Sequence, residues 1–124
     1  PSTLPALVRA QRLQEKASYA GFDWEEIDGA WEKLDEELNE LKQAQELGKI
    51  ENIKEEIGDV LFSVVNLSRF FNVAAEDMLR QSNRKFIRRF KKIEQKLKEE
   101  GKKIEDSTLK EMGIIWEQAK KQNL

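Results

Sequence analysis

Hydrophobic residues recur at three- and four-residue intervals over most of this chain, and that interval is typical of amphipathic helices. Between about residues 29 and 47, the apolar stripe consists of Trp31, Leu34, Leu38, Leu41 and Ala44. A second stripe runs from about 50 to 71 and becomes apolar nearly all round in the segment VLFSVVNL. We therefore expect two long helices that meet at Gly48, with the second helix buried on several sides.

Three further helices are expected from the same pattern and from residues that end helices. Their predicted ranges are about 4–19, 74–100 and 108–121. Pro5 suits the first turn of the first of these helices, while Asn72 and Gly101 are expected to bound the long one. No segment shows the alternation of a strand. The predicted fold class is therefore all-α, a helical bundle that forms one domain over residues 1–124.

The connections between the predicted helices carry candidate capping residues. Residues 20–28 should form a loop with one helical turn, in which Asp23 or Asp28 caps the following helix. A short polar side chain at this position accepts a hydrogen bond from a free backbone N–H of the first turn. By the same reasoning, Asp106 or Ser107 should cap the last helix.

The composition narrows the chemistry that the chain can perform. Charged residues make up 37% of the 124 positions with a formal net charge of -2, and there is neither cysteine nor histidine. A thiolate nucleophile, cysteine-bound zinc and a Ser-His-Asp triad are therefore excluded. Any catalysis must depend on carboxylates, on lysine or arginine, and on a hard metal ion.

Charge and hydropathy also limit the expected partners and location. No basic excess indicates a nucleic acid polymer or an anionic membrane as partner. No apolar run reaches the roughly 18–20 residues of a membrane span, so we expect a soluble, cytoplasmic protein. Because the chain starts at Pro1 and not at Met, we expect a processed chain or the C-terminal fragment of a longer protein.

Two acidic pairs lie symmetrically about Gly48. Glu40 and Glu56 are each eight residues from this glycine, and Glu37 and Asp59 are each eleven residues from it. Residues three apart share a helix face, so an antiparallel helical hairpin would bring both pairs to the same level. Four carboxylates are suitable ligands for a hard cation, and the hairpin therefore predicts a magnesium site.

Two other interpretations of the acidic pairs remain open. The carboxylates can form an internal ion-pair network with Lys33 or Lys54, or the acids of the second helix can act as N-caps. The position of Asp59 beside Val60 and Val65 favours the metal site. We expect that segment to be buried, and a buried carboxylate is costly unless it is paired.

Basic and aromatic residues further along the chain are candidates for nucleotide contacts. Lys85 and Arg89 lie one helical turn apart, a spacing that suits a polyphosphate, although a solvated basic face has the same pattern. Trp116 and Lys120 have the same spacing on the last helix. The indole can stack on a nucleobase, or it can belong to the core with its apolar neighbours.

The order of these motifs resembles the MazG nucleoside triphosphate pyrophosphohydrolases. Their signature is EExxE, a variable spacer and then ExxD, which matches EELNE at 36–40 and EIGD at 56–59. The likeness continues through GFDW at 21–24, KFIRRF at 85–90 and WEQAK at 116–120. It covers nearly all of the chain and is greatest to the C-terminal copy of tandem MazG proteins, of which only one copy is present here.

This resemblance implies the all-α NTP pyrophosphatase fold, an intimate homodimer, and magnesium-dependent hydrolysis of NTPs or dNTPs to the monophosphate and pyrophosphate. It suggests a broad-specificity enzyme that cleans the nucleotide pool. By matched position the implied metal ligands are Glu37, Glu40, Glu56 and Asp59. The implied triphosphate contacts are Lys33, Glu37, Lys85, Arg88 and Arg89. Trp116 and Lys120 would surround the nucleoside, while Glu36 or Glu55 would accept the proton of the attacking water. The alternative is a non-catalytic helical dimerisation domain that supports a partner domain.

Overall fold

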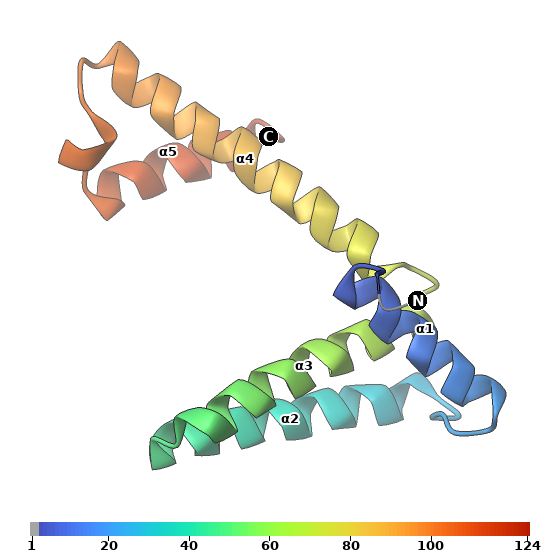
Figure 1. The fold of residues 1–124 in the computed structure, drawn as a ribbon. Helices are drawn as coiled ribbons and strands as arrows, with labels where there is room; N and C mark the ends of the chain where they lie inside the picture. The colour runs from blue at the N-terminus through green and yellow to red at the C-terminus, as the bar shows by residue number, and fades with distance from the viewer. Residues whose placement is uncertain (1–2) are drawn as a thin grey trace. The chain divides into compact units, whose positions relative to one another are not determined.

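The computed structural model describes residues 3–124, and every regular element in this range is a helix (Figure 1). The elements are α1 (Ala6–Tyr19), α2 (Ile27–Leu47), α3 (Ile50–Phe70), α4 (Ala75–Glu99), a 3-10 helix (Ile104–Asp106) and α5 (Leu109–Lys121). The prediction of an all-α fold is confirmed. Contacts between residues divide the chain into two compact units, of which the first ends at Met78 and the second is Leu79–Leu124.

The first unit is built on the antiparallel hairpin of α2 and α3, which pack against each other (Figure 1). Gly48 ends α2 in the left-handed conformation, with φ of 68°. Its N–H donates to the carbonyl of Ala44 at 3.0 Å, which closes the last turn of the helix. A side chain at this φ would be strained. The predicted hairpin about Gly48 is confirmed.

Helix α1 packs against α3, and the loop between α1 and α2 differs from its prediction. The loop consists of turns and bends without a helical turn. Neither predicted residue caps α2, because the N-cap position is Glu26, whose side chain makes no capping hydrogen bond. Asp23 instead accepts the N–H of Trp24, and Asp28 lies within the first turn of the helix.

The expected burial of α3 on several sides is wrong within this chain. Val65 is almost completely buried, but Leu61, Phe62 and Val64 are 54%, 48% and 41% exposed. Helices α1 and α2 cover only part of α3, so its remaining apolar residues face outward. Asp59 is exposed as well, and the predicted cost of burying a carboxylate does not apply to it. Helix α3 then ends before Asn72, which takes the left-handed φ of 58° expected of a breaker.

The second unit has its own hydrophobic core. Ile93 and Leu97 of α4 pack with Ile115 of α5, and four partly buried residues surround them, namely Phe90, Ile104, Met112 and Trp116. The N-cap of α5 is Thr108, whose Oγ1 accepts the N–H of Glu111 at 3.1 Å. The predicted caps Asp106 and Ser107 are therefore wrong, because the 3-10 helix occupies Asp106 and the chain extends through the next residue before α5 begins.

Within residues 3–124, no single helix is both long enough and apolar enough to cross a membrane. Only α3 and α4 taken together, as a pair broken by a bend, meet the criteria of length and composition.

Candidate functional site

The α2–α3 hairpin gathers carboxylates into two overlapping groups. One group consists of Glu36, Glu37 and Glu40 on α2, and the other joins Glu37 to Glu56 and Asp59 of α3. In each group one carboxylate oxygen of every residue lies within 4.8 Å of the others. Glu37 belongs to both groups. Because the two acidic pairs are equally distant from Gly48 along the chain, the hairpin brings them to the same level. The five carboxylates of the two groups, hereafter called the acidic group, converge around Glu37.

The centre of the acidic group is buried and contains two carboxylate oxygens without a hydrogen-bond donor. Glu37 is only 5% exposed. Its Oε2 atom and the Oε2 atom of Glu56 are both buried without a hydrogen-bond partner in the protein. An unpaired buried carboxylate oxygen is costly, and hard divalent cations take such oxygens as ligands. The acidic group therefore fits a metal ion, with ligands supplied by both helices.

The carboxylates of the acidic group have different affinities for a proton. The hydrogen bond from Lys33 holds the pKa of Glu37 below its usual value, although burial opposes this shift. Burial raises the pKa of Glu56 to about 7, and hydrogen bonds with Glu37 and Glu40 that require a proton on Glu56 add to the effect. Like charges at close range cannot all ionise freely. A divalent cation would compete with that shared proton.

Of the two alternative interpretations of the acidic pairs, the ion-pair network is present in part and the N-capping role is not. Lys33 does form ion pairs, with its Nζ 3.0 Å from Glu37 and 3.7 Å from Glu36. Lys54 pairs instead with Glu51 at 3.3 Å, outside the acidic group. Capping is wrong for Glu56, which lies beyond the first turn of α3, where the N-cap is Lys49. One lysine thus partly neutralises the acidic group and leaves its two buried oxygens unpaired.

The two candidate bases are placed differently. Glu36 is exposed and belongs to the acidic group. Glu55 is also exposed and is in neither set of converging carboxylates. Their predicted role in accepting a proton stays a prediction.

The remaining predicted site residues lie in the second unit. Lys85 and Arg88 are exposed on α4, and Lys120 is exposed on α5. The Nε of Arg89 donates to the Leu124 carbonyl at 2.6 Å, and its guanidinium lies 5.2 Å from the ring centre of Trp116. The indole thus packs beside the core of this unit, as the alternative interpretation from the sequence supposed. The substrate contacts of these residues stay predictions.

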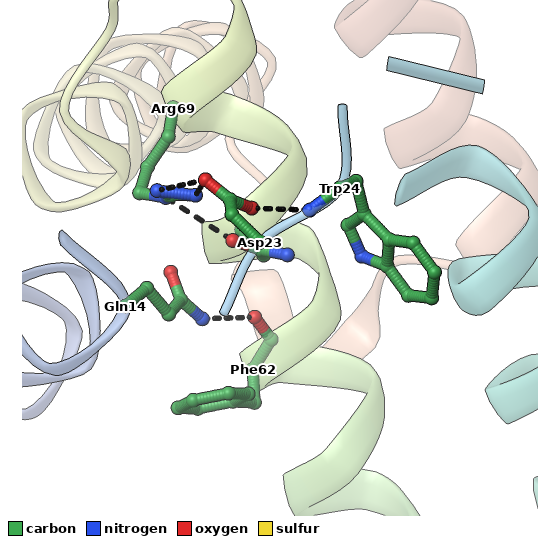
Figure 2. Close-up of polar contacts among 6 residues, drawn as sticks. Gln14, Asp23, Trp24, Phe62 and Arg69 are labelled. Carbon is green, nitrogen blue, oxygen red and sulfur yellow. Dashed lines mark hydrogen bonds and ion pairs between the residues drawn. The ribbon is translucent and has the colours of Figure 1, made fainter. Parts of the chain in front are cut away.

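Beside the acidic group, the first unit contains a pocket of about 360 Å³, bounded by α1, α3, the start of α2 and the loop that carries Trp24. Figure 2 shows how its walls are joined. Gln14 of α1 donates to the Phe62 carbonyl of α3 at 2.9 Å, and Arg69 holds Asp23 of the loop at 2.6 Å. The sequence prediction gave no role to this pocket. The motif GFDW was its only sequence signal.

Comparison with known proteins gives the family. The profile of the MazG nucleotide pyrophosphohydrolase domain matches residues 27–94. The chain is 48% identical over 117 residues to the nucleoside triphosphate pyrophosphohydrolase/pyrophosphatase MazG of Thermotoga maritima, which covers 94% of this chain and 45% of that protein. The chain belongs to the MazG family. The predicted resemblance to MazG proteins is therefore confirmed.

Two further relatives show how much of a longer protein this chain spans. The nucleoside triphosphate pyrophosphohydrolase of Escherichia coli K12 is 38% identical over 129 residues, covering 100% of this chain and 48% of its own length. A protein of Bacillus subtilis called YabN is 45% identical over 69 residues, which are 56% of this chain and 14% of that protein. This MazG chain spans about half the length of the nucleoside triphosphate pyrophosphohydrolases it matches.

The matched MazG segment contains the whole acidic group and the predicted triphosphate contacts of α4, namely Lys85, Arg88 and Arg89. It begins at the first residue of α2 and continues past Met78 into the second compact unit. Trp116 and Lys120 lie beyond residue 94, within the longer matches to the two pyrophosphohydrolases. The helices α2 and α3 that carry the carboxylates, together with most of α4, are therefore the defining MazG elements of this chain.

Proposed function

We propose that this MazG domain hydrolyses nucleoside triphosphates or deoxynucleoside triphosphates to the monophosphate and pyrophosphate, with magnesium as cofactor. The names of its two full-length relatives support the reaction class. The observation that carries the proposal is the convergence of Glu37, Glu56 and Asp59, whose oxygens lie within 4.8 Å of one another. A broad substrate range would suit an enzyme that removes unwanted nucleotides.

The magnesium ligands in this proposal are Glu37, Glu40, Glu56 and Asp59. Bound there, Mg²⁺ would neutralise charge on the triphosphate and lower the pKa of a water molecule. Lys33 adds a positive charge at the edge of the acidic group, 3.0 Å from Glu37. Its ammonium group has three donors, so it can keep its pairing with Glu37 and also bind a phosphate oxygen.

A carboxylate outside the metal ligands would accept the proton of the attacking water. The water oxygen forms a bond to the α-phosphorus. The bond between this phosphorus and the oxygen that bridges it to the β-phosphate breaks, and pyrophosphate leaves. Glu36 is the better placed of the two candidates, because it belongs to the acidic group while Glu55 does not.

The proposal also assigns substrate contacts to the second unit. Lys85, Arg88 and Arg89 would bind the triphosphate, and Trp116 with Lys120 would contact the nucleoside. The support is their match to the family motifs and the positive charge of α4. Alanine substitution at Lys85, which is exposed, would test the triphosphate contact with little risk to the fold.

We further propose that the domain forms a homodimer through the uncovered side of α3. Ile57, Leu61 and Val64 are 46%, 54% and 41% exposed and follow one another at four- and three-residue spacing. Such a row of apolar side chains on one helix face is typical of a protein interface. The same observation favours the second candidate function, a non-catalytic dimerisation domain.

One experiment separates these two functions. Purified protein is incubated with a panel of NTPs and dNTPs, with and without magnesium, and the products are identified by chromatography. We expect monophosphate and pyrophosphate only with magnesium. Glu56→Gln should abolish this activity, whereas Glu51→Gln, an exposed glutamate at the start of the same helix, should not. Orthophosphate alone, or full activity of Glu56→Gln, would contradict the proposed enzyme.

A further inference from the structure

The surroundings of Arg89 give Trp116 a second role. We propose that Trp116 and the turn after α5 position the Arg89 guanidinium to bind a phosphate group, an inference that rests on the triphosphate contact proposed for Arg89. The guanidinium carbon lies 5.2 Å from the ring centre of Trp116, and the Nε atom donates to the Leu124 carbonyl at 2.6 Å. Two contacts from outside α4 therefore hold one side chain of α4.

The indole that faces Arg89 is itself held in place. The ring centres of Phe86 and Trp116 are 5.5 Å apart with planes inclined by 53°, and Phe86 stacks on Phe90 at 5.9 Å. Phe90 and Trp116 also pack against the core of the second unit. A guanidinium over a fixed aromatic face is attracted by the ring, and it loses little further freedom when a ligand binds. The indole therefore restricts Arg89 before any substrate is present.

A turn after α5 brings the second contact to Arg89. Asn123 follows the C-cap of α5 and takes the left-handed φ of 63°. Its N–H donates to the Lys120 carbonyl at 3.1 Å, and the N–H of Leu124 donates to the Ala119 carbonyl at 3.1 Å. This pair of hydrogen bonds is the Schellman motif, which reverses the chain at the C-terminus of a helix. The motif thus places the Leu124 carbonyl where it accepts the Arg89 Nε–H.

These contacts leave the other edge of the Arg89 guanidinium available. A guanidinium has five N–H donors, one on Nε and four on the terminal nitrogens Nη1 and Nη2. Within residues 3–124, only the Nε donor of Arg89 forms a hydrogen bond. The two terminal nitrogens form a planar fork that can bind two oxygens of one phosphate at once. Because Nε is bound and the indole lies beside the guanidinium, Arg89 presents this fork in one direction.

Binding of inorganic tripolyphosphate to the full chain with magnesium tests this inference, because this ligand has phosphates but no nucleoside. Calorimetry measures the affinity of the wild type, Trp116→Leu, Asn123→Val and Asn123→Gly, each with Arg89 intact and in an Arg89→Ala background. With Arg89 intact, Trp116→Leu and Asn123→Val should each weaken binding by about three- to tenfold, the factor expected when one long side chain must be ordered on binding. Asn123→Gly should bind as the wild type does, since glycine adopts a φ of 63° readily and valine does not.

The Arg89→Ala background shows whether the losses pass through Arg89. In that background Trp116→Leu and Asn123→Val should cause no further loss, because the side chain that they position is absent. Equal losses in both backgrounds would overturn the inference. If Trp116 contacted only the nucleoside, Trp116→Leu would weaken the binding of α,β-methylene ATP and spare tripolyphosphate, which would overturn it as well.

NMR measures how Arg89 is held without any ligand. The Arg89 Nε–H of the wild type should exchange slowly with water because it is hydrogen-bonded. Asn123→Val should accelerate this exchange, whereas Asn123→Gly should not. Asn123 is exposed and outside the core, so its substitution should leave the fold intact. Arg84, an exposed arginine of the same helix, is the internal control, and its Nε–H should exchange rapidly in every variant.

The inference and the proposed function can fail separately. A wild type that hydrolyses no nucleoside triphosphate contradicts the proposed function, while tripolyphosphate affinities and exchange rates still report on Arg89. A wild type that hydrolyses nucleoside triphosphates but binds no tripolyphosphate contradicts only the positioning of Arg89. The same conclusion follows if Trp116→Leu and Asn123→Val both keep the wild-type affinity.

Discussion

Removal of the Asp23 carboxylate tests how the loop before α2 is attached to α3. One oxygen of Asp23 lies 2.6 Å and 3.2 Å from the two terminal nitrogens of Arg69, and the other accepts the Trp24 N–H at 2.8 Å. The side chains of Asp23 and Arg69 are 22% and 11% exposed. Asp23→Ala would leave an almost buried guanidinium without its charged partner.

The expected loss of stability follows from this burial. A fully exposed ion pair contributes about 0–1 kcal/mol, while a hydrogen bond to a charged group contributes about 1.5–3 kcal/mol. Because the pair is mostly shielded, we expect the free energy of unfolding to fall by about 2–3 kcal/mol. In a protein of this size, 1 kcal/mol corresponds to roughly 3–5 °C in Tm, so Tm should fall by about 6–15 °C.

The effect should depend on pH in a defined direction. Burial alone would raise the pKa of Asp23, but hydrogen bonds from Ser18, Arg69 and the Trp24 N–H outweigh it and lower the pKa below 3.8. A carboxylate with a lowered pKa stabilises the fold above its unfolded pKa and loses this contribution as the pH falls through its folded pKa. The difference in Tm between the wild type and Asp23→Ala should therefore be complete at pH 6 and shrink below about pH 3.8.

Thermal unfolding followed by circular dichroism, at one protein concentration and several pH values, measures both effects. Asp35→Ala, which removes an exposed carboxylate of α2, is the matched control and should change Tm by less than about 2 °C. The reasoning is refuted if Asp23→Ala unfolds at the wild-type temperature at pH 6. It is also refuted if the difference persists undiminished at pH 3.

Three other substitutions have expected outcomes of their own. Gly29→Ala should displace the Trp24 indole and cost about 1–3 kcal/mol; an unchanged Trp24 Nε1–H NMR signal would contradict this. Leu97→Ala should open a cavity in the core of the second unit and lower the free energy of unfolding in urea by about 2–5 kcal/mol; a loss below 1 kcal/mol would show that the site collapses. Thr108→Ala removes the hydrogen bond to Glu111 at the start of α5 and should cost about 1 kcal/mol, whereas Thr108→Ser should restore most of it.

The sequence predicted the helices well because local residues determine their ends. Gly48 and Gly101 take the positive φ values that side chains disfavour, and the helices stop within about one residue of the predictions. The capping residue of α5 was missed because Asp106, Ser107 and Thr108 are three adjacent residues of suitable chemistry. Which of them acts depends on the 3-10 helix before α5, and no local pattern indicated that helix.

Burial was harder to predict than helicity. The apolar run of α3 suggested cover on several sides, but the pattern of one helix does not reveal which neighbours its own chain provides. Asp59 is consequently exposed, and Glu37 is the buried member of the acidic group. The polar pair across the pocket could not be predicted either, since Gln14 contacts the Phe62 carbonyl from 48 positions away.

The position of Lys33 between the pocket and the carboxylates has a thermodynamic consequence. Its ammonium is held by Glu37, and this hydrogen bond is also what raises the pKa of Lys33. A cation bound to Glu37 neutralises part of its negative charge and weakens its hydrogen bond with Lys33. The ammonium of Lys33 then attracts an anion more strongly. Metal and polyphosphate should therefore strengthen each other's binding, and reciprocity requires the enhancement to be the same factor whichever ligand is added first.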